Sequence, residues 1–123
     1  MKQFDLLIID DERRFADMLA KRLEMRGCAC QVSYNGQDGI GMIERYKFVL
    51  VVLDLCLPDI YGAEVLSRIK SMSPETSVIV LTGHGSYEDR QECMKRGASG
   101  FFNKPLEIDR LLSILEEAGE KLS

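Results

Sequence analysis

One stretch of the sequence, Phe48–Leu53, is apolar at every position. A strand with one face in water alternates apolar and polar residues, whereas an unbroken apolar run is typical of a strand that is covered on both faces. Parallel strands are joined by crossover connections, usually helices, and these helices supply the cover. The run therefore predicts an α/β fold in which helices pack on both sides of a parallel sheet.

The rest of the chain alternates short apolar runs with segments of helical period. Four further strands are predicted at Phe4–Ile9, Cys28–Ser33, Val78–Leu81 and Ser99–Phe102. Between them, apolar residues recur three and four positions apart, with clear stripes at Phe15, Met18, Leu19 and Leu23, at Val65, Leu66 and Ile69, and at Ile108, Leu111, Leu112 and Leu115. Five strands alternating with five helices predict a doubly wound parallel sheet in a three-layer sandwich.

Glycine and proline mark where the predicted helices end. Gly27 follows the first stripe as a C-terminal stop, and Ser73 and Pro74 break the third. The second helix is predicted near Gln37–Tyr46 against its propensity, because Gly39 and Gly41 each cost a helix about 1 kcal/mol relative to alanine.

Length and charge narrow the classes of function. A chain of 123 residues suits one domain, predicted over residues 1–123. The net charge of −4, with 16 Lys and Arg spread along the chain, argues against direct binding of nucleic acid. No apolar run approaches the roughly 20 residues that cross a bilayer, and the N-terminus lacks a secretory cleavage pattern. These features predict a cytoplasmic protein without a membrane partner.

The four cysteines predict no metal site. Cys28 and Cys30 are two apart in a strand-like run and point to one face, while Cys56 and Cys93 are distant in the sequence. No CxxC pair or histidine cluster accompanies them, which argues against a zinc site. We expect reduced thiols that pack as small hydrophobic groups.

Polar residues follow four of the five predicted strands. Asp10 and Asp11 follow the first, Asp54 the third and Thr82 the fourth, and Lys104 comes just after the fifth. Because parallel strands all end at one edge of the sheet, where ligands bind, we expect three carboxylates, a hydroxyl and an ammonium group to share that edge.

Clustered carboxylates need a cation, since like charges at close range raise at least one pKa. A set of oxygen ligands favours a hard ion such as Mg²⁺ or Mn²⁺. Such an ion and Lys104 would form an anion receptor beside Asp54, as in-line attack of a carboxylate on a phosphoryl group requires. The predicted nucleophile is Asp54.

Each of these residues also has a plain structural interpretation. Asp10 or Asp11 alone would be a helix N-cap, because the next helix starts near Arg13. Asp54 and Thr82 would be turn residues, and Lys104 a solvated charge. One shared edge explains all of them at once, which favours the functional interpretation.

Four segments together resemble the receiver domains of two-component response regulators. They are Leu7–Glu12 (LIIDDE), Leu53–Gly62 (LDLCLPDIYG), Leu81–Gly83 (LTG) and Gly100–Pro105 (GFFNKP), in the family's order and spacing. The resemblance implies the flavodoxin-like strand order 2-1-3-4-5. It also implies a signalling module rather than an enzyme, with no catalysis beyond its own phosphorylation and slow dephosphorylation.

The resemblance assigns a role to each residue of the edge. Asp54 accepts the phosphoryl group, Lys104 pairs with its oxygens, and Thr82 hydrogen-bonds to it. Mg²⁺ would be bound by Asp11, Asp54 and the backbone carbonyl of Cys56, with Asp10 acting through water. The loop after the third strand carries Pro58, which stiffens it, and Gly62, which allows an unusual backbone angle.

Three positions leave alternatives open. The family's switch aromatic corresponds to Phe101, which has no hydroxyl and is either a working switch with Thr82 or a plain core residue. Cys56 and His84 occupy positions that tune phosphoryl lifetime in the family. His84, the one histidine, is either an exposed loop residue or a contact of the phosphoryl group or of water.

The expected partners are a sensor histidine kinase or a phosphotransfer protein, and an output domain or second copy bound through the fourth helix (near Tyr87–Arg96), the last strand and the last helix. Three other functions compete with this one. A flavin carrier of the same fold would place a phosphate loop where Asp10 and Asp11 stand. An aspartate-dependent phosphatase would place a second aspartate at Cys56. A phosphorylation-independent interaction module remains the alternative.

Overall fold

Five parallel strands form one sheet through the middle of the molecule, and the computed structural model describes residues 1–122. The strands, in chain order, are β1 (Gln3–Ile9), β2 (Cys30–Ser33), β3 (Lys47–Leu53), β4 (Ser77–Thr82) and β5 (Gly100–Asn103). Their order across the sheet is β2-β1-β3-β4-β5, and every pairing is parallel. The predicted fold class and strand order are confirmed. Ser123, the last residue of the predicted domain, lies outside the described residues.

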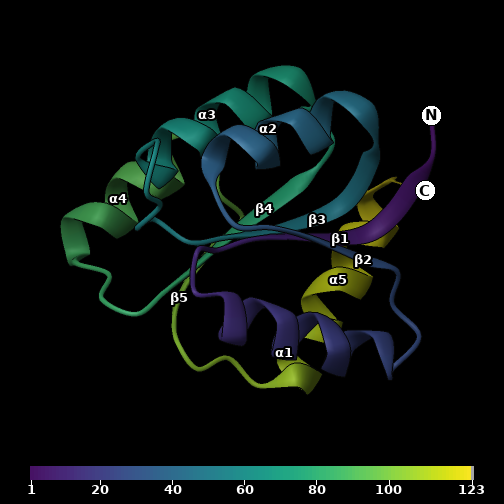
Figure 1. Cartoon of the computed structure of the whole chain (residues 1–123). Coiled ribbons are helices and arrows are strands. Elements are labelled where there is room, and N and C mark those ends of the chain that lie inside the picture. The colour runs from purple at the N-terminus through teal and green to yellow at the C-terminus, as the bar shows by residue number, and fades with distance from the viewer. Residues whose placement is uncertain (123) are drawn as a thin grey trace.

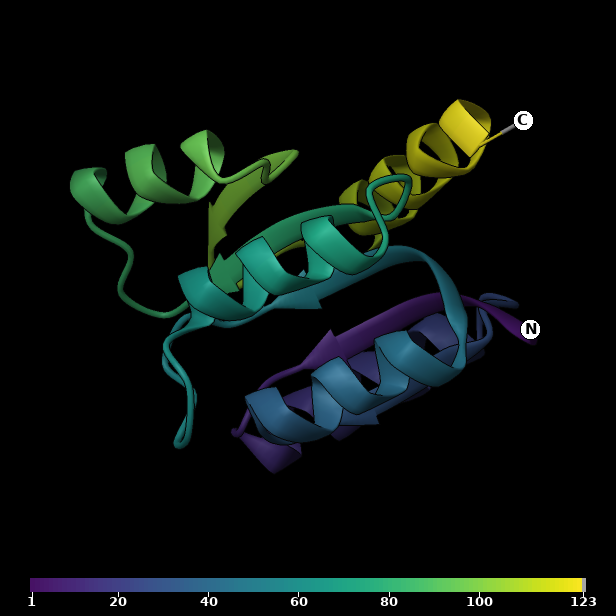
Figure 2. The same cartoon turned by 90° about the horizontal axis from the view of Figure 1, so that it is seen from above.

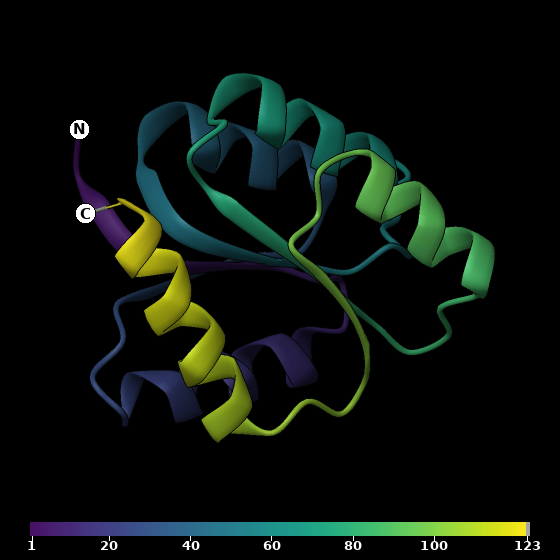
Figure 3. The ribbon, with the colours of Figure 1, turned by 180° about the vertical axis from the view of Figure 1, so that it is seen from behind.

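Helices cover both faces of this sheet. They are α1 (Arg13–Glu24), α2 (Gly36–Arg45), α3 (Gly62–Met72), α4 (Tyr87–Lys95) and α5 (Ile108–Leu122). Helices α2, α3 and α4 lie on one face, and α1 and α5 lie on the other (Figure 1). The view from above shows α2, α3 and α4 side by side, and the view from behind shows α5 and α1 on their own face (Figures 2 and 3).

The strand period of two divides the core between these faces. Leu7, Val51 and Val80 point to one side and pack with residues of α2, α3 and α4. Their chain neighbours Leu6 and Leu50 point to the other side and pack with α1 and α5. The whole of Phe48–Leu53 is buried, so the strand covered on both faces is confirmed.

The second strand begins at Cys30, two residues later than predicted. The amide of Cys28 donates to the carbonyl of Leu23, 3.1 Å away, and so belongs to the turn that ends α1. In this turn Gly27 has φ +89°, which confirms the helix stop predicted there. Cys28 and Cys30 contact the same core, as predicted.

Helix α2 forms in spite of its two glycines. A Cβ at Gly39 would lie 2.6 Å from the side chain of Ile9, whereas one at Gly41 would meet nothing within 4 Å. Gly39 therefore lets α2 approach β1 closely, and the side chain of Asn35 accepts a hydrogen bond from the Asp38 amide at the start of the helix. Packing and a cap offset the poor propensity.

Candidate functional site

The carboxyl ends of β1 and β3–β5 bring the predicted polar residues to one edge. The Asp54 amide donates to the carbonyl of Ile9, at 2.9 Å, and the Lys104 amide donates to the carbonyl of Thr82, at 2.8 Å. These backbone bonds between neighbouring strands fix Asp54 relative to Asp10, and Lys104 relative to Thr82. Asp10, Asp54, Thr82 and Lys104 therefore share one edge, as the strand order predicted, whereas the predicted meeting of Asp11 with Asp10 and Asp54 is not found.

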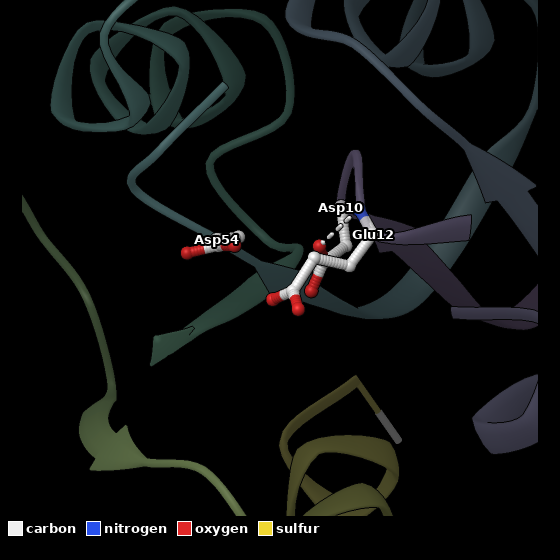
Figure 4. A group of neighbouring side chains, drawn as sticks. All are labelled: Asp10, Glu12 and Asp54. Carbon is white, nitrogen blue, oxygen red and sulfur yellow. Dashed lines mark hydrogen bonds between the residues drawn. The ribbon is translucent and has the colours of Figure 1, made fainter. Parts of the chain in front are cut away.

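Three carboxylates meet at this edge, and we call Asp10, Glu12 and Asp54 the acidic pocket. One oxygen of each lies within 4.8 Å of the others. Figure 4 shows Asp54 at the end of β3 next to Asp10 and Glu12, which lie in the turn after β1. Asp10 Oδ1 also accepts a hydrogen bond of 2.9 Å from the Glu12 amide, so the turn itself holds the Asp10 carboxylate in place.

Lys104 lies among these carboxylates. Its Nζ is 2.8 Å from Asp10 Oδ2, 2.5 Å from Glu12 Oε1 and 3.4 Å from Asp54 Oδ2. The Lys104 side chain is only 12% exposed, and its Nζ lies 4.3 Å from the centre of the Phe15 ring. One buried cation thus partly balances three negative groups, and it is closer to Asp10 and Glu12 than to Asp54.

Burial and charge act in opposite directions on the pKa values of Asp10 and Lys104. Burial raises the pKa of Asp10 to about 6, although hydrogen bonds from Lys104 and the Glu12 amide favour the charged form. Burial acts to lower the pKa of Lys104, but its hydrogen bonds with Asp10 and Glu12 and the nearby negative charges outweigh burial and raise it above its ordinary value. The pocket holds more negative charge than Lys104 can balance.

Asp11 and Cys56 lie at the rim of the pocket. Asp11 is exposed, and no oxygen of it belongs to the three-carboxylate group. Burial raises the pKa of the Cys56 thiol, and the charges of Asp54 and Asp11 raise it further, which places Asp11 near Cys56. The structure therefore brings Asp10, Asp54 and Lys104 together and leaves Asp11 beside them.

Glu12 is the pocket residue that the sequence analysis did not single out. It is the N-cap residue of α1 but its side chain makes no capping hydrogen bond. The carboxylate is paired with Lys104 instead. The available signal was its place in the run Asp10-Asp11-Glu12, where a third acidic side chain follows two strand-end carboxylates.

Thr82 and Phe101 pack against each other through a glycine. Both residues are buried: Thr82 is the last residue of β4, and Phe101 lies in β5. A Cβ on Gly85 would lie 2.4 Å from the Phe101 ring and 3.0 Å from the Thr82 methyl group, so only glycine fits between them. The Phe101 ring occupies an inward position in the core shared with α3 and α4.

The remaining predicted positions are His84 and the four cysteines, and the structure corrects the prediction for one cysteine. His84 is exposed in the loop after β4. All four cysteines are free, and Cys28, Cys30 and Cys93 are at least half-buried as predicted, but Cys56 is exposed. It lies in the loop that leaves the sheet at the carboxyl end of β3, outside both core clusters. Cys56 is not one of the packed thiols.

The comparison with protein families decides the class of the chain. A family model described as the response regulator receiver domain matches residues 6–116. The chain belongs to that family. Receiver domains are modules of two-component signalling that work through aspartyl phosphorylation, and they are not conventional enzymes.

Known receiver proteins share both sequence and fold with this one. The transcriptional regulatory protein YkoG of Bacillus subtilis is 34% identical over 118 residues, 96% of this chain. The solution structure of the beryllofluoride-activated NtrC4 receiver domain dimer is 33% identical, with a TM-score of 0.87, and each chain is covered completely. A response regulator from Burkholderia pseudomallei, solved with a phosphorylated aspartic acid, a calcium ion and citrate, is 30% identical over 98% of this chain and 70% of that one, with a TM-score of 0.86.

The relatives include longer proteins. This receiver spans 52% of YkoG and about a quarter of other curated regulators such as ZraR of Salmonella typhimurium. Among residues 1–122, no helix has the length and apolar character needed to cross a membrane. The cytoplasmic setting stays a prediction.

Proposed function

We propose that Asp54 accepts a phosphoryl group from the phosphohistidine of a sensor histidine kinase or a phosphotransfer protein, and that residues 1–123 act as one receiver domain. The observation that carries this proposal is the placement of Asp54. Its carboxylate is 4% exposed, stands at the end of β3 and faces the Lys104 ammonium and two further carboxylates. The phosphorylated aspartic acid of the Burkholderia pseudomallei relative supports the same chemistry here.

The transfer is a substitution at phosphorus. An oxygen of Asp54 attacks the phosphorus atom, the phosphorus–nitrogen bond of the donor histidine breaks, and the imidazole nitrogen keeps the electron pair. Lys104 would move from Asp10 and Glu12 to pair with a phosphoryl oxygen, over a short distance because its Nζ is already 3.4 Å from Asp54. The Thr82 hydroxyl would donate a hydrogen bond to another of these oxygens.

The donor set of the pocket fits a hard divalent cation. The nearby ligand atoms are carboxylate oxygens, and the Cys56 thiol, with its raised pKa, stays protonated at neutral pH. Asp11, Asp54 and the Cys56 carbonyl would hold Mg²⁺ or Mn²⁺, with Asp10 acting through water. Glu12 is a further candidate, since it lies in the pocket. Such an ion neutralises charge on the phosphoryl oxygens when it is bound.

Residues around the pocket would transmit the phosphorylation state and set the lifetime of the phosphoryl group. Phe101 and Thr82 share a contact with Gly85, so phosphorylation that draws Thr82 inward would move the loop that starts α4. Cys56 in the loop after β3 and His84 in the loop after β4, both exposed, would set the access of water to the phosphoryl group. The face formed by α4, β5 and α5 would bind an output domain or a second copy of the chain.

Acetyl phosphate with Mg²⁺ tests this proposal. Mass spectrometry of the intact protein should detect one added phosphoryl group, lost in Asp54→Asn and in the presence of a chelator. Asp11→Asn and Glu12→Gln, measured side by side, should show which carboxylate the metal needs, with the Mg²⁺ requirement rising at least about tenfold for a ligand. The absence of an adduct in the unaltered chain would leave the phosphorylation-independent interaction module as the function. An adduct that persists in Asp54→Asn would overturn the proposal by placing the phosphoryl group on another residue.

A further inference from the structure

Tyr61 ends the loop that begins with Asp54, and the loop holds it in a fixed position relative to that carboxylate. The next residue, Gly62, packs on the backbone of the proposed phosphoacceptor: a Cβ there would lie 2.6 Å from the Asp54 carbonyl oxygen and 2.5 Å from the Cα of Leu55. The Gly62 amide also donates to the Leu55 carbonyl, at 3.0 Å. Movement of the backbone at Asp54 is therefore transmitted to Tyr61.

The Tyr61 side chain reaches from this loop to α4. It is 52% exposed, and its hydroxyl donates to Asp89 Oδ1, at 3.0 Å. Helices α3 and α4 begin at the same end of the sheet, which lets the N-cap residue of α3 touch the first turn of α4 (Figure 2).

Asp89 also caps the start of α4, as the third residue of that helix. Its Oδ2 accepts from the Ser86 amide, at 3.1 Å, and its own amide donates to Ser86 Oγ, at 3.0 Å, which together form a capping box. The Ser86 amide and the Tyr61 hydroxyl both hold the pKa of Asp89 below its usual range. One carboxylate thus serves both the cap of α4 and the bond to the phosphoacceptor loop.

The other side of the same cap lies against the end of β4 and against β5 through Gly85. This glycine lies against Thr82 and Phe101 and directly precedes Ser86. A shift of Thr82 therefore moves the capping box away from, or toward, Tyr61. The ring of Phe101 has no hydroxyl with which to fix either of its positions, whereas Tyr61 supplies a hydroxyl at the point where both loops meet.

We propose that Tyr61 is a positioning residue whose hydrogen bond to Asp89 holds the start of α4 against the β3–α3 loop while Asp54 carries no phosphoryl group, and that phosphorylation breaks this bond. The proposal rests on the function proposed above. A bond made in only one of two states shifts their populations by its full free energy. Removing it should therefore loosen α4 in the unmodified protein and favour the phosphorylated arrangement.

Tyr61→Phe removes the hydroxyl and keeps the ring, and Tyr87→Phe is the matched control. Tyr87 is the first residue of α4 and 68% exposed, and its hydroxyl contacts only Gln91 of the same helix among the described residues. Two quantities are measured in each variant: amide hydrogen exchange at Arg90 and Gln91 without ligand, and the affinity for beryllofluoride with Mg²⁺, followed by NMR.

We expect Tyr61→Phe to speed the exchange about two- to tenfold and to tighten beryllofluoride binding by a similar factor, the range for one hydrogen bond, with neither change in Tyr87→Phe. Unchanged exchange, equal effects in both variants, or weaker binding in Tyr61→Phe would overturn the proposal. A chain that binds no beryllofluoride would instead refute the proposed function, and the exchange rates would still decide whether Tyr61 holds α4.

Discussion

Helices α3 and α4 lie next to each other on one face of the sheet, yet they are held in different ways. Helix α3 buries Gly62, Ala63, Val65, Leu66 and Ile69. Helix α4 buries only Cys93. Burial of apolar side chains is the main source of tertiary stability, so α3 is part of the core, whereas α4 lies on top of it.

Polar contacts take the place of the missing apolar ones in α4. Arg90 donates to the Phe101 carbonyl at 3.2 Å, Arg96 pairs with Glu92 and also donates to Ser67 of α3, and Tyr61 bonds to Asp89. Exposed polar contacts contribute little each and can be exchanged one at a time. A helix attached in this way can move without opening the core, which suits the part of a receiver that reports phosphorylation.

Truncating one buried side chain in each helix gives the largest expected difference. Leu66→Ala should lower the free energy of unfolding by about 2–5 kcal/mol, because Leu66 is completely buried and leaves a cavity. Cys93→Ala removes the largest buried side chain that α4 offers and should cost about 1 kcal/mol. Urea unfolding measures both. Equal losses would show that α4 contributes as much to the core as α3.

The acidic pocket at the carboxyl edge of the sheet is electrostatically costly. Asp10 is 3% exposed, and burial raises its pKa from an ordinary value of 3.8 to about 6 in the folded protein. The folded state therefore binds a proton more tightly than the unfolded state. Between these two values, stability falls as the pH rises, and the full cost of the ionised group is present above pH 6.

Asp10→Asn should accordingly stabilise the metal-free protein by about 1–3 kcal/mol at pH 7.5, since asparagine carries no charge but can still accept from the Glu12 amide. The gain should shrink as the pH falls and disappear near pH 4, where Asp10 is protonated. Urea unfolding with a chelator across this range is the measurement. Added Mg²⁺ should reduce the gain, because it stabilises the carboxylate. A gain that does not change with pH would have another origin.

Strand-end carboxylates were predictable because the rule that connects them is topological. The apolar run Phe48–Leu53 predicted a buried parallel strand, and the carboxyl ends of parallel strands share one edge of the sheet. The sequence alone was therefore enough to predict that Asp10, Asp54, Thr82 and Lys104 lie together at that edge. The same rule carries no information on side-chain torsions. It could not show that Glu12, at an N-cap, turns its carboxylate to Lys104 while Asp11 stays at the rim.

Local packing explains the other differences between prediction and structure. Gly39 lowers helix propensity, but its missing Cβ is what lets α2 approach Ile9. The late start of β2 comes from the turn that ends α1, which takes up Cys28. The bond between Tyr61 and Asp89 joins residues 28 apart in sequence, and no periodicity or motif signals it.

The smallest expected effect, that of Ser86→Ala, distinguishes a loss of stability in α4 alone from a loss of stability in the whole protein. Ser86→Ala removes the hydroxyl that accepts from the Asp89 amide and should cost α4 about 1 kcal/mol. Because α4 lies on top of the core, this loss should appear as about fivefold faster amide exchange within α4, with the exchange of α3 and the midpoint of global unfolding nearly unchanged. Native-state hydrogen exchange resolves the two helices in one experiment. If both helices lose protection together, α3 and α4 open as one unit, and α4 cannot move independently of the core.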